Sequence, residues 1–323
     1  IKKILQQKTF KSILTDIWCD CDTTLKGSVS KDAIETYFTR IMNRKRSETI
    51  LSLQEKLAWD GTDFESSLKI ISLWFAHALS NDSNLLETNL NDFKPTVLAF
   101  MHFIWQVKRK LFGYQAEMHM APIFLGEQGN GKSEFIRNIS NVLNVPFFNL
   151  VRDAYVDEIG EEKNEAILAQ SFINILDEMA GATKAELNKV KNFITRHTVN
   201  PRVFHSQTTM GEMSNLSTFI GAANAQNLSE ILHDESGNRR FFPIKVSGFL
   251  EKKINVLKPE YKMMCEKLSW VLESGECFPH QFDSLPLWKM INHEWPCFVR
   301  NDAVKQVQSE HQYNPVKQWL ENF

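Results

Sequence analysis

The segment Ile123-Phe-Leu-Gly-Glu-Gln-Gly-Asn-Gly-Lys-Ser-Glu-Phe135 says most about the fold of this chain. Its centre, Gly126 to Ser133, matches the pattern G-x-x-x-x-G-K-[ST], with an apolar run before it and a helical pattern after it. Glycines at these places let consecutive backbone N–H groups point at phosphate oxygens, at the positive end of a helix. Because both flanks are present, the segment indicates a phosphate-binding loop between a strand and a helix rather than a glycine-rich turn.

The loop predicts how a nucleotide would be held. Lys132 is expected to reach the β- and γ-phosphates, and Ser133 to ligate Mg²⁺. The predicted nucleotide-binding residues of the loop are Gly126, Gln128, Gly129, Asn130, Gly131, Lys132, Ser133 and Glu134. ATP with Mg²⁺ is the only cofactor inferred, because the nine His and five Cys residues show no metal-ligand spacing.

Outward from the loop, short apolar runs alternate with helical stretches. Strands are predicted at 123–125, 147–151, 172–176, 218–222 and 241–246, and helices at 132–143, 161–170, 184–197 and 228–233. This alternation predicts an α/β fold with a five-stranded parallel sheet between helices.

The segments on either side of this α/β part have other patterns. Residues 1–118 read as a helical N-terminal region, with a turn at Trp59-Asp60-Gly61 and a loop at 81–92. Five prolines break residues 251–323 into short elements, which indicates a small helical or winged-helix C-terminal subdomain. We therefore expect three domains, at 1–118, 119–250 and 251–323.

Polar residues follow two of the predicted strands. Asp177-Glu178 ends the strand 172–176; Asp177 is expected to hold Mg²⁺, and Glu178 to orient and deprotonate an attacking water. Asn224 ends the strand 218–222 and is expected to polarise that water or contact the γ-phosphate. The alternatives are a solvated strand end for the two acids and a helix cap or turn for Asn224.

Two arginines, Arg239 and Arg240, precede the last predicted strand. In ring-forming ATPases an Arg at this place reaches the γ-phosphate bound by the neighbouring subunit. We expect one of the two to act in this way and the other to pair with Asp234 or Glu235. The sequence does not distinguish between them.

Together, the phosphate loop, the Leu-Asp-Glu strand end, Asn224 and Gly237-Asn-Arg-Arg-Phe241 resemble the virulence-associated protein E family of phage, satellite and plasmid replication proteins, which group with superfamily 3 helicases. Trp59-Asp60-Gly61 and Tyr313-Asn-Pro315 are also similar to segments of that family. The resemblance implies an AAA+-type ATPase core that assembles as a homo-oligomeric, hexameric ring and moves on DNA. It also implies a primase domain or other replication proteins as partners.

The resemblance also implies a β-hairpin that lines the central pore and grips DNA. The corresponding interval is 184–217, with the hairpin itself expected over Thr198–Met213. The candidate DNA-binding residues are Lys189, Lys191, Arg196, Arg202 and His205, and the alternative for each is an ordinary surface charge. Asn215-Leu-Ser217 stands where relatives commonly have an Arg, a departure from the family pattern.

Composition limits the remaining possibilities. The net charge of −2 over 323 residues gives no global signature of nucleic-acid binding, and the basic runs 40–46 and 108–110 are interpreted as solvated helix faces. The sequence predicts no transmembrane segment or secretory signal, a cytoplasmic location, and, from the start at Ile1, a fragment of a longer protein. The C-terminal tryptophans and phenylalanines are expected to form a core rather than to stack on bases.

The leading interpretation is an ATP-driven DNA translocase or helicase that replicates a mobile genetic element. One alternative is an AAA+ or signalling ATPase that remodels protein partners without touching DNA. A second alternative, a small-molecule kinase with the same loop, fits less well, because Asp177-Glu178 and the late Arg pair suit activation of water.

Overall fold

The computed structural model describes residues 30–78, 94–177, 179, 182–201, 211–225, 240–246, 254–255, 276–277, 283–300 and 302–310. The chain divides into two compact units, Ile1–Lys56 and Leu57–Phe323. The described part of the first unit is one helix, α3 (Lys31–Lys56), with Asp32 in its first turn and Lys56 in its last, each at the helix end that favours its charge.

A five-stranded parallel sheet forms the centre of the second unit. It consists of β1 (Ala121–Leu125), β2 (Val151–Ala154), β3 (Ile173–Leu176), β6 (Thr218–Ala223) and β7 (Phe241–Lys245), in the order β2-β3-β6-β1-β7. In the register, Ile123 lies beside Gly221 on one side and Pro243 on the other. The three inner strands β3, β6 and β1 are buried along their whole length, as expected for parallel strands covered on both faces.

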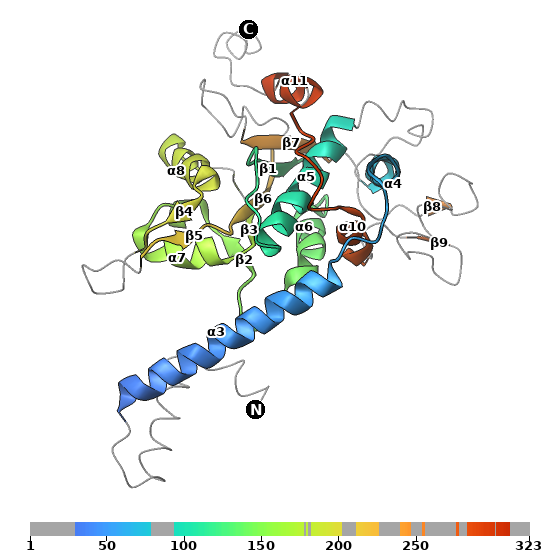
Figure 1. Cartoon of the computed structure of the whole chain (residues 1–323). Coiled ribbons are helices and arrows are strands. Elements are labelled where there is room, and N and C mark those ends of the chain that lie inside the picture. Colours follow the sequence, from blue (N-terminus) through green and yellow to red (C-terminus); the bar gives the residue numbers. More distant parts are fainter. Residues whose placement is uncertain are drawn as a thin grey trace. The chain divides into compact units, whose positions relative to one another are not determined.

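Helices cover both faces of the sheet (Figure 1). Ile123 and Leu125 point into a core shared with α7 (Glu162–Gln170) and α8 (Lys184–Thr195). Phe124, one residue out of phase, contacts Phe135 of α6 (Lys132–Ser140), and α5 (Lys94–Leu111) packs on the same side. Successive side chains of β1 therefore point to opposite faces of the sheet and belong to two different hydrophobic cores.

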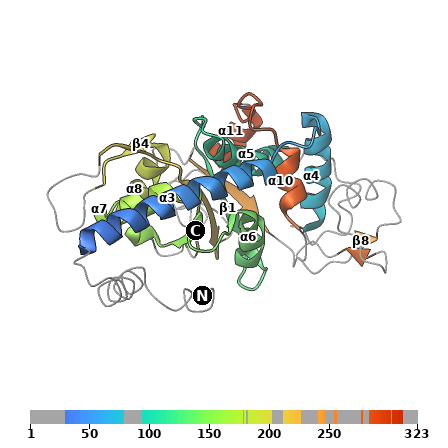
Figure 2. The ribbon, with the colours of Figure 1, turned by 60° about the horizontal axis from the view of Figure 1, so that its bottom comes forward.

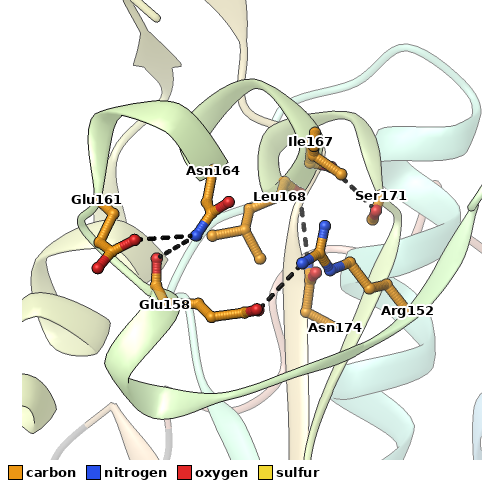
Figure 3. A network of polar contacts seen from close by, with 8 residues as sticks. All are labelled: Arg152, Glu158, Glu161, Asn164, Ile167, Leu168, Ser171 and Asn174. Atoms are coloured by element: carbon orange, nitrogen blue, oxygen red, sulfur yellow. Dashed lines mark hydrogen bonds and ion pairs between the residues drawn. The ribbon is translucent and has the colours of Figure 1, made fainter. Parts of the chain in front are cut away.

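A polar network holds α7 against β2 and β3 (Figure 3). Asn174 of β3 is fully buried, and its amide donates to the Leu168 carbonyl oxygen and to Ser217 Oγ. Arg152 of β2 pairs with Glu158 at 3.0 Å, in the 3₁₀ helix η3 (Val156–Glu158) that precedes α7. Buried polar groups with partners on neighbouring elements fix how those elements sit against one another.

On the other face, α10 (Leu285–Met290) packs against α4 (Phe64–Ala78) and α5 (Figure 2). Ser67 Oγ donates to the Met290 carbonyl oxygen at 3.1 Å, which joins α4 to α10. The buried Lys108 ammonium of α5 donates to the carbonyl oxygens of Trp288 and Ile291 at 2.9 and 2.5 Å. A lysine thus satisfies carbonyl groups at the end of α10 that have no helical partner.

The basic run 108–110 is therefore not a solvated helix face, and that interpretation is wrong. Lys108 is fully buried and Lys110 is 7% exposed, with its ammonium donating to the Ser217 carbonyl oxygen. Burial lowers the pKa of both lysines from 10.5 to about 7. Arg109 lies over the rings of Trp105 and Tyr114.

The predicted α/β fold is confirmed, with the parallel sheet, its flanking helices and a helical segment before it. One strand was misplaced: the strand predicted at 147–151 is observed at Val151–Ala154, because Phe147 and Asn149 have φ of 77° and 48° and form a turn. The turn at Trp59-Asp60-Gly61 is observed between α3 and α4. The loop 81–92 and the helix 228–233 lie outside the described residues.

Two further expectations concern the remaining segments. β4 (Thr198–Val199) pairs antiparallel with β5 (Met213–Ser214), as the ends of the predicted hairpin would, and residues 202–210 lie outside the described residues. In the C-terminal part, β8 (Ile254–Asn255) pairs with β9 (Glu276–Cys277), and α11 (Asp302–Glu310) packs on α5 and β7. The boundaries at 118 and 250 remain a proposal. No helix among the described residues is long and apolar enough to cross a membrane.

Candidate nucleotide-binding site

The phosphate loop joins the end of β1 to the start of α6, as predicted from its sequence. Gly129 and Gly131 have φ of 88° and 73°, in the left-handed region that suits glycine, and Gly131 is the N-cap of α6. A Cβ on Gly126 would lie 2.4 Å from the Val246 carbonyl oxygen, so only glycine fits between the loop and the end of β7. Asn130 Nδ2 donates to the same carbonyl oxygen at 3.3 Å.

The loop and two strand ends enclose a cavity of about 420 Å³, which we call the phosphate pocket. Its lining comprises Gln128, Gly129, Gly131, Lys132, Ser133, Glu134, Asp177, Ala222, Ala223 and Asn224. Of the predicted loop residues, Gly126 and Asn130 shape the pocket without lining it. The two alanines at the end of β6 were not foreseen, and their small side chains leave room beside Asn224.

Lys132 lies at the centre of this site. Its ammonium donates to the carbonyl oxygens of Gly126 and Glu127 at 2.9 and 2.7 Å, and to Asn224 Oδ1 at 3.1 Å. Burial lowers the pKa of Lys132, and the charge of Asp177 opposes that shift. The ammonium therefore lies at the base of the loop, joined to the strand end that carries Asn224.

Ser133 and Asp177 form a second pair in the pocket. Ser133 Oγ donates to Asp177 Oδ1 at 2.7 Å, so the hydroxyl from α6 and the carboxylate from the end of β3 are in direct contact. Hydroxyl and carboxylate oxygens are ligands that suit Mg²⁺, which commonly takes one or two protein ligands together with phosphate oxygens and water. The donor set present fits the predicted magnesium site.

Sequence reasoning missed Arg137, which acts on the same carboxylate. Its Nη2 atom lies 3.2 Å from Asp177 Oδ2 and 3.3 Å from Asp153 Oδ1, so it joins α6 to the ends of β2 and β3. The sequence did place Arg137 in the helix that begins at Lys132, directly after the phosphate loop. Nothing in the sequence, however, indicated that Asp153 would stand beside Asp177.

The remaining predicted residues are placed elsewhere. Glu178, Arg239, Arg202 and His205 lie outside the described residues. Arg240 lies at the start of β7 and lines a different cavity, so it is not brought together with Lys132. Lys189 is exposed and Arg196 pairs with Glu165 at 2.7 Å. Lys191 is only 3% exposed, which corrects its inclusion among surface residues for DNA.

Comparison with known proteins identifies the family. Residues 55–267, about two thirds of the chain, match the family model of the virulence-associated protein E-like domain. The chain belongs to this family. The match contains the phosphate loop, Asp177, Asn224 and Arg240, so the site described above lies within the family domain of this member. No curated protein matches the chain.

Among solved structures, two of the C-terminal region of NrS-1 align at 16% and 14% sequence identity. They cover 78% and 82% of this chain, with TM-scores of 0.41 and 0.45, and the chain spans 53% and 58% of their length. The X-ray structure of JCV helicase aligns at 11% identity over 95% of this chain and 77% of its own, with a TM-score of 0.37.

Proposed function

We propose that this chain is an ATP-dependent DNA translocase or helicase, of the superfamily 3 type, that acts in the replication of a mobile genetic element such as a phage, satellite or plasmid. The observation that carries the proposal is the meeting of Lys132, Ser133, Asp177 and Asn224, from three separate segments, at one pocket. A lysine that binds phosphates, a hydroxyl and a carboxylate that hold Mg²⁺, and a polar group that positions water are the parts that P-loop enzymes use to hydrolyse a nucleoside triphosphate.

Each residue has a defined task in this proposal. Lys132 exchanges its bonds to loop carbonyls for bonds to the β- and γ-phosphates, while Asn224 holds its ammonium in place. Ser133 and Asp177 would hold Mg²⁺, which neutralises charge on the phosphates and fixes their position when bound. Glu178 is the proposed base for the attacking water; it directly follows Asp177 in the chain.

We infer that hydrolysis needs a second copy of the chain. Arg240 precedes β7, and its carbonyl oxygen accepts from the Ala121 amide at the start of β1. Gly126 follows the last of the five residues of β1, so at about 3.3 Å per residue the two lie roughly 16 Å apart. This exceeds the reach of an Arg side chain. Arg240, or the adjacent Arg239, would therefore serve a neighbour's nucleotide, in a ring for which we propose six copies.

DNA contact would come from the pore side of such a ring. The antiparallel pair β4 and β5 flanks the segment that carries Arg202 and His205. Lys189 lies on α8, and Arg196 directly follows that helix. Positive side chains on this hairpin would hold the DNA backbone without reading its sequence. A cytoplasmic location and an association with a primase or other replication proteins belong to the same proposal.

Steady-state ATP hydrolysis at low salt, with and without single-stranded DNA, tests the proposal. We expect hydrolysis that DNA stimulates, abolished by Lys132→Ala and retained by Lys69→Ala, which removes an exposed lysine of α4. Turnover by the Lys132 variant equal to the wild type would contradict the assignment of the pocket.

The same assay separates the alternative. Hydrolysis that DNA does not alter, together with no DNA binding at that salt concentration, would favour an AAA+ or signalling ATPase that remodels protein partners. The net charge of −2 makes this comparison informative, because any DNA binding must then come from a local patch rather than from the whole chain.

A further inference from the structure

A second cavity, of about 340 Å³, lies at the N-terminal ends of β1 and β7, whereas the phosphate pocket lies at the C-terminal ends of β1, β3 and β6. No lining residue is common to the two. We call the second cavity the basic cavity. Its polar lining consists of His119, Thr195, His197, Arg240, Lys305 and Gln308. These come from the segment before β1, the end of α8, the start of β7 and α11. The cavity is thus built by several elements of the second unit rather than by one loop.

The described lining of the basic cavity contains basic and neutral polar groups but no carboxylate. His119 and His197 have ring centroids 5.5 Å apart in an edge-to-face arrangement. Behind them, the buried ammonium of Lys110 donates to the Ser217 carbonyl oxygen. Lys305 stands at the rim, 63% exposed, 3.2 Å from Asp302. Several positive or protonatable groups therefore share a partly enclosed space.

His119 carries a buried polar atom that the described residues do not satisfy. Its Nε2 atom is buried and has no hydrogen-bond partner among the described residues. Burial, together with the smaller effects of the nearby charges of Lys110, His197 and His102, lowers the pKa of His119 from 6.5 to about 3. A bound anion would oppose this shift, since it would accept a hydrogen bond from the imidazole and offset the surrounding positive charge.

We propose that the basic cavity binds a phosphoryl group through His119 and His197 beside Arg240, and that in the assembled ring this group belongs to the nucleotide in the phosphate pocket of a second copy of the chain. The second half rests on the proposed function. A head-to-tail contact between copies places one surface of a subunit against a different surface of its neighbour, and the two cavities lie at opposite ends of the strands. The histidines are therefore assigned a role that extends that of Arg240.

Binding of inorganic pyrophosphate tests the first half without requiring hydrolysis. The protein is the full chain carrying Lys132→Ala, which disables the phosphate pocket, and the measurement is titration calorimetry at low salt. We expect binding that His119→Gln with His197→Gln weakens by about tenfold or more, as for the loss of hydrogen bonds to a charged group. Equal pyrophosphate affinity with and without the histidine changes, or no binding at all, would overturn the proposal.

Two lysine variants keep this test independent of folding. Lys305→Ala removes a rim ammonium from a helical (i, i+3) ion pair and is expected to weaken pyrophosphate binding several-fold. Lys45→Ala removes an exposed lysine from the same kind of pair, with Glu48 in α3, and is the matched control. An equal effect of the two variants would show general charge attraction and would count against the cavity.

Mixing two inactive chains tests which phosphoryl group is bound. Chains with Lys132→Ala keep the basic cavity, and chains with the double histidine change keep the phosphate pocket. At equal mixing, about one interface in four has both intact, so we expect hydrolysis to return toward a quarter of the wild-type rate. Loss of pyrophosphate binding without such recovery would assign the cavity to free phosphate and overturn the second half. Absence of hydrolysis by the wild type would instead contradict the proposed function, while the binding test would still stand.

Discussion

The ammonium of Lys132 lies 3.1 Å from Asn224 Oδ1, which joins the first residue of α6 to the residue that follows β6. The two residues are 92 positions apart in the sequence, and the parallel pairing of β1 with β6 brings them together. Asn224 is therefore part of the support of the lysine as well as a candidate for contact with the γ-phosphate.

Replacing Asn224 by Ala removes an acceptor from Lys132 and a polar group from the phosphate pocket. We expect kcat for ATP hydrolysis to fall about tenfold or more, with a smaller change in nucleotide affinity, because the loop carbonyls still hold the lysine. Steady-state kinetics and binding of a fluorescent nucleotide measure the two effects separately. Asn144→Ala, an exposed asparagine after η2 (Asn141–Leu143), is the control. An unchanged kcat would mean that Asn224 has only a structural role, in the turn that follows β6.

Arg137 places a positive charge beside the predicted magnesium ligand Asp177. Its removal would relieve the repulsion of a divalent ion, which at such distances in water is about 1 kcal/mol or more. We therefore expect Arg137→Gln to lower, several-fold, the Mg²⁺ concentration that gives half-maximal hydrolysis, and Arg137→Lys to leave it nearly unchanged. The stability change should be small, because both ion pairs of Arg137 are about half exposed.

The control for this prediction is Arg300→Gln, which removes an exposed arginine that pairs with Glu117 away from the phosphate pocket. A higher Mg²⁺ requirement in Arg137→Gln would mean that the arginine acts mainly by orienting the carboxylate of Asp177. The two variants at position 137 separate these effects because Lys keeps the charge and loses the planar geometry.

The sequence was sufficient for the parts of the site that depend on local chemistry. The loop between β1 and α6 requires glycine at positive φ, and the acid and amide after β3 and β6 stand at strand ends, so each has a signature within a few residues. Strand β2 was misplaced because the apolar run before it is a turn, whereas Val151–Ala154 is an edge strand with polar residues.

The sequence was insufficient where partners come from distant segments. Lys108 and Lys110 read as solvated because three basic residues end an amphipathic helix. Their acceptors, the carbonyl oxygens of residues 288, 291 and 217, are more than 100 positions away and exist only in the folded chain. The link from Arg137 to Asp153 and Asp177 depends in the same way on the order of strands in the sheet.

Gly126 tests the geometry of the phosphate loop directly. In Gly126→Ala, the new Cβ would overlap the Val246 carbonyl oxygen, which is held by the end of β7, so the loop must move. We expect at least a tenfold loss of nucleotide affinity with the sheet intact by circular dichroism. Gly113→Ala, also at positive φ but with open space around it, should cost stability alone. Equal nucleotide affinity in the wild type and Gly126→Ala would contradict this close contact.

His102 makes the stability of the second unit depend on pH. Burial lowers its pKa from 6.5 to about 4, although its ring contacts the Met118 carbonyl oxygen at 3.0 Å, so the folded chain keeps it neutral where the unfolded chain binds a proton. The unfolded state binds more protons between pH 6.5 and 4, and the free energy of unfolding therefore falls as pH falls through that window.

For His102 alone, the fall between pH 7.5 and 5 amounts to about 2 kcal/mol. His102→Gln keeps a donor for Met118 and removes the titration, so urea unfolding should show a shallower decline with acid in this variant than in the wild type. His119 contributes in the same direction in both proteins, which is why the difference between them is the quantity to measure. Above pH 7.5 the two profiles should run parallel. Parallel profiles down to pH 5 would contradict the prediction, because they would show that His102 binds its proton as readily in the folded chain as in the unfolded one.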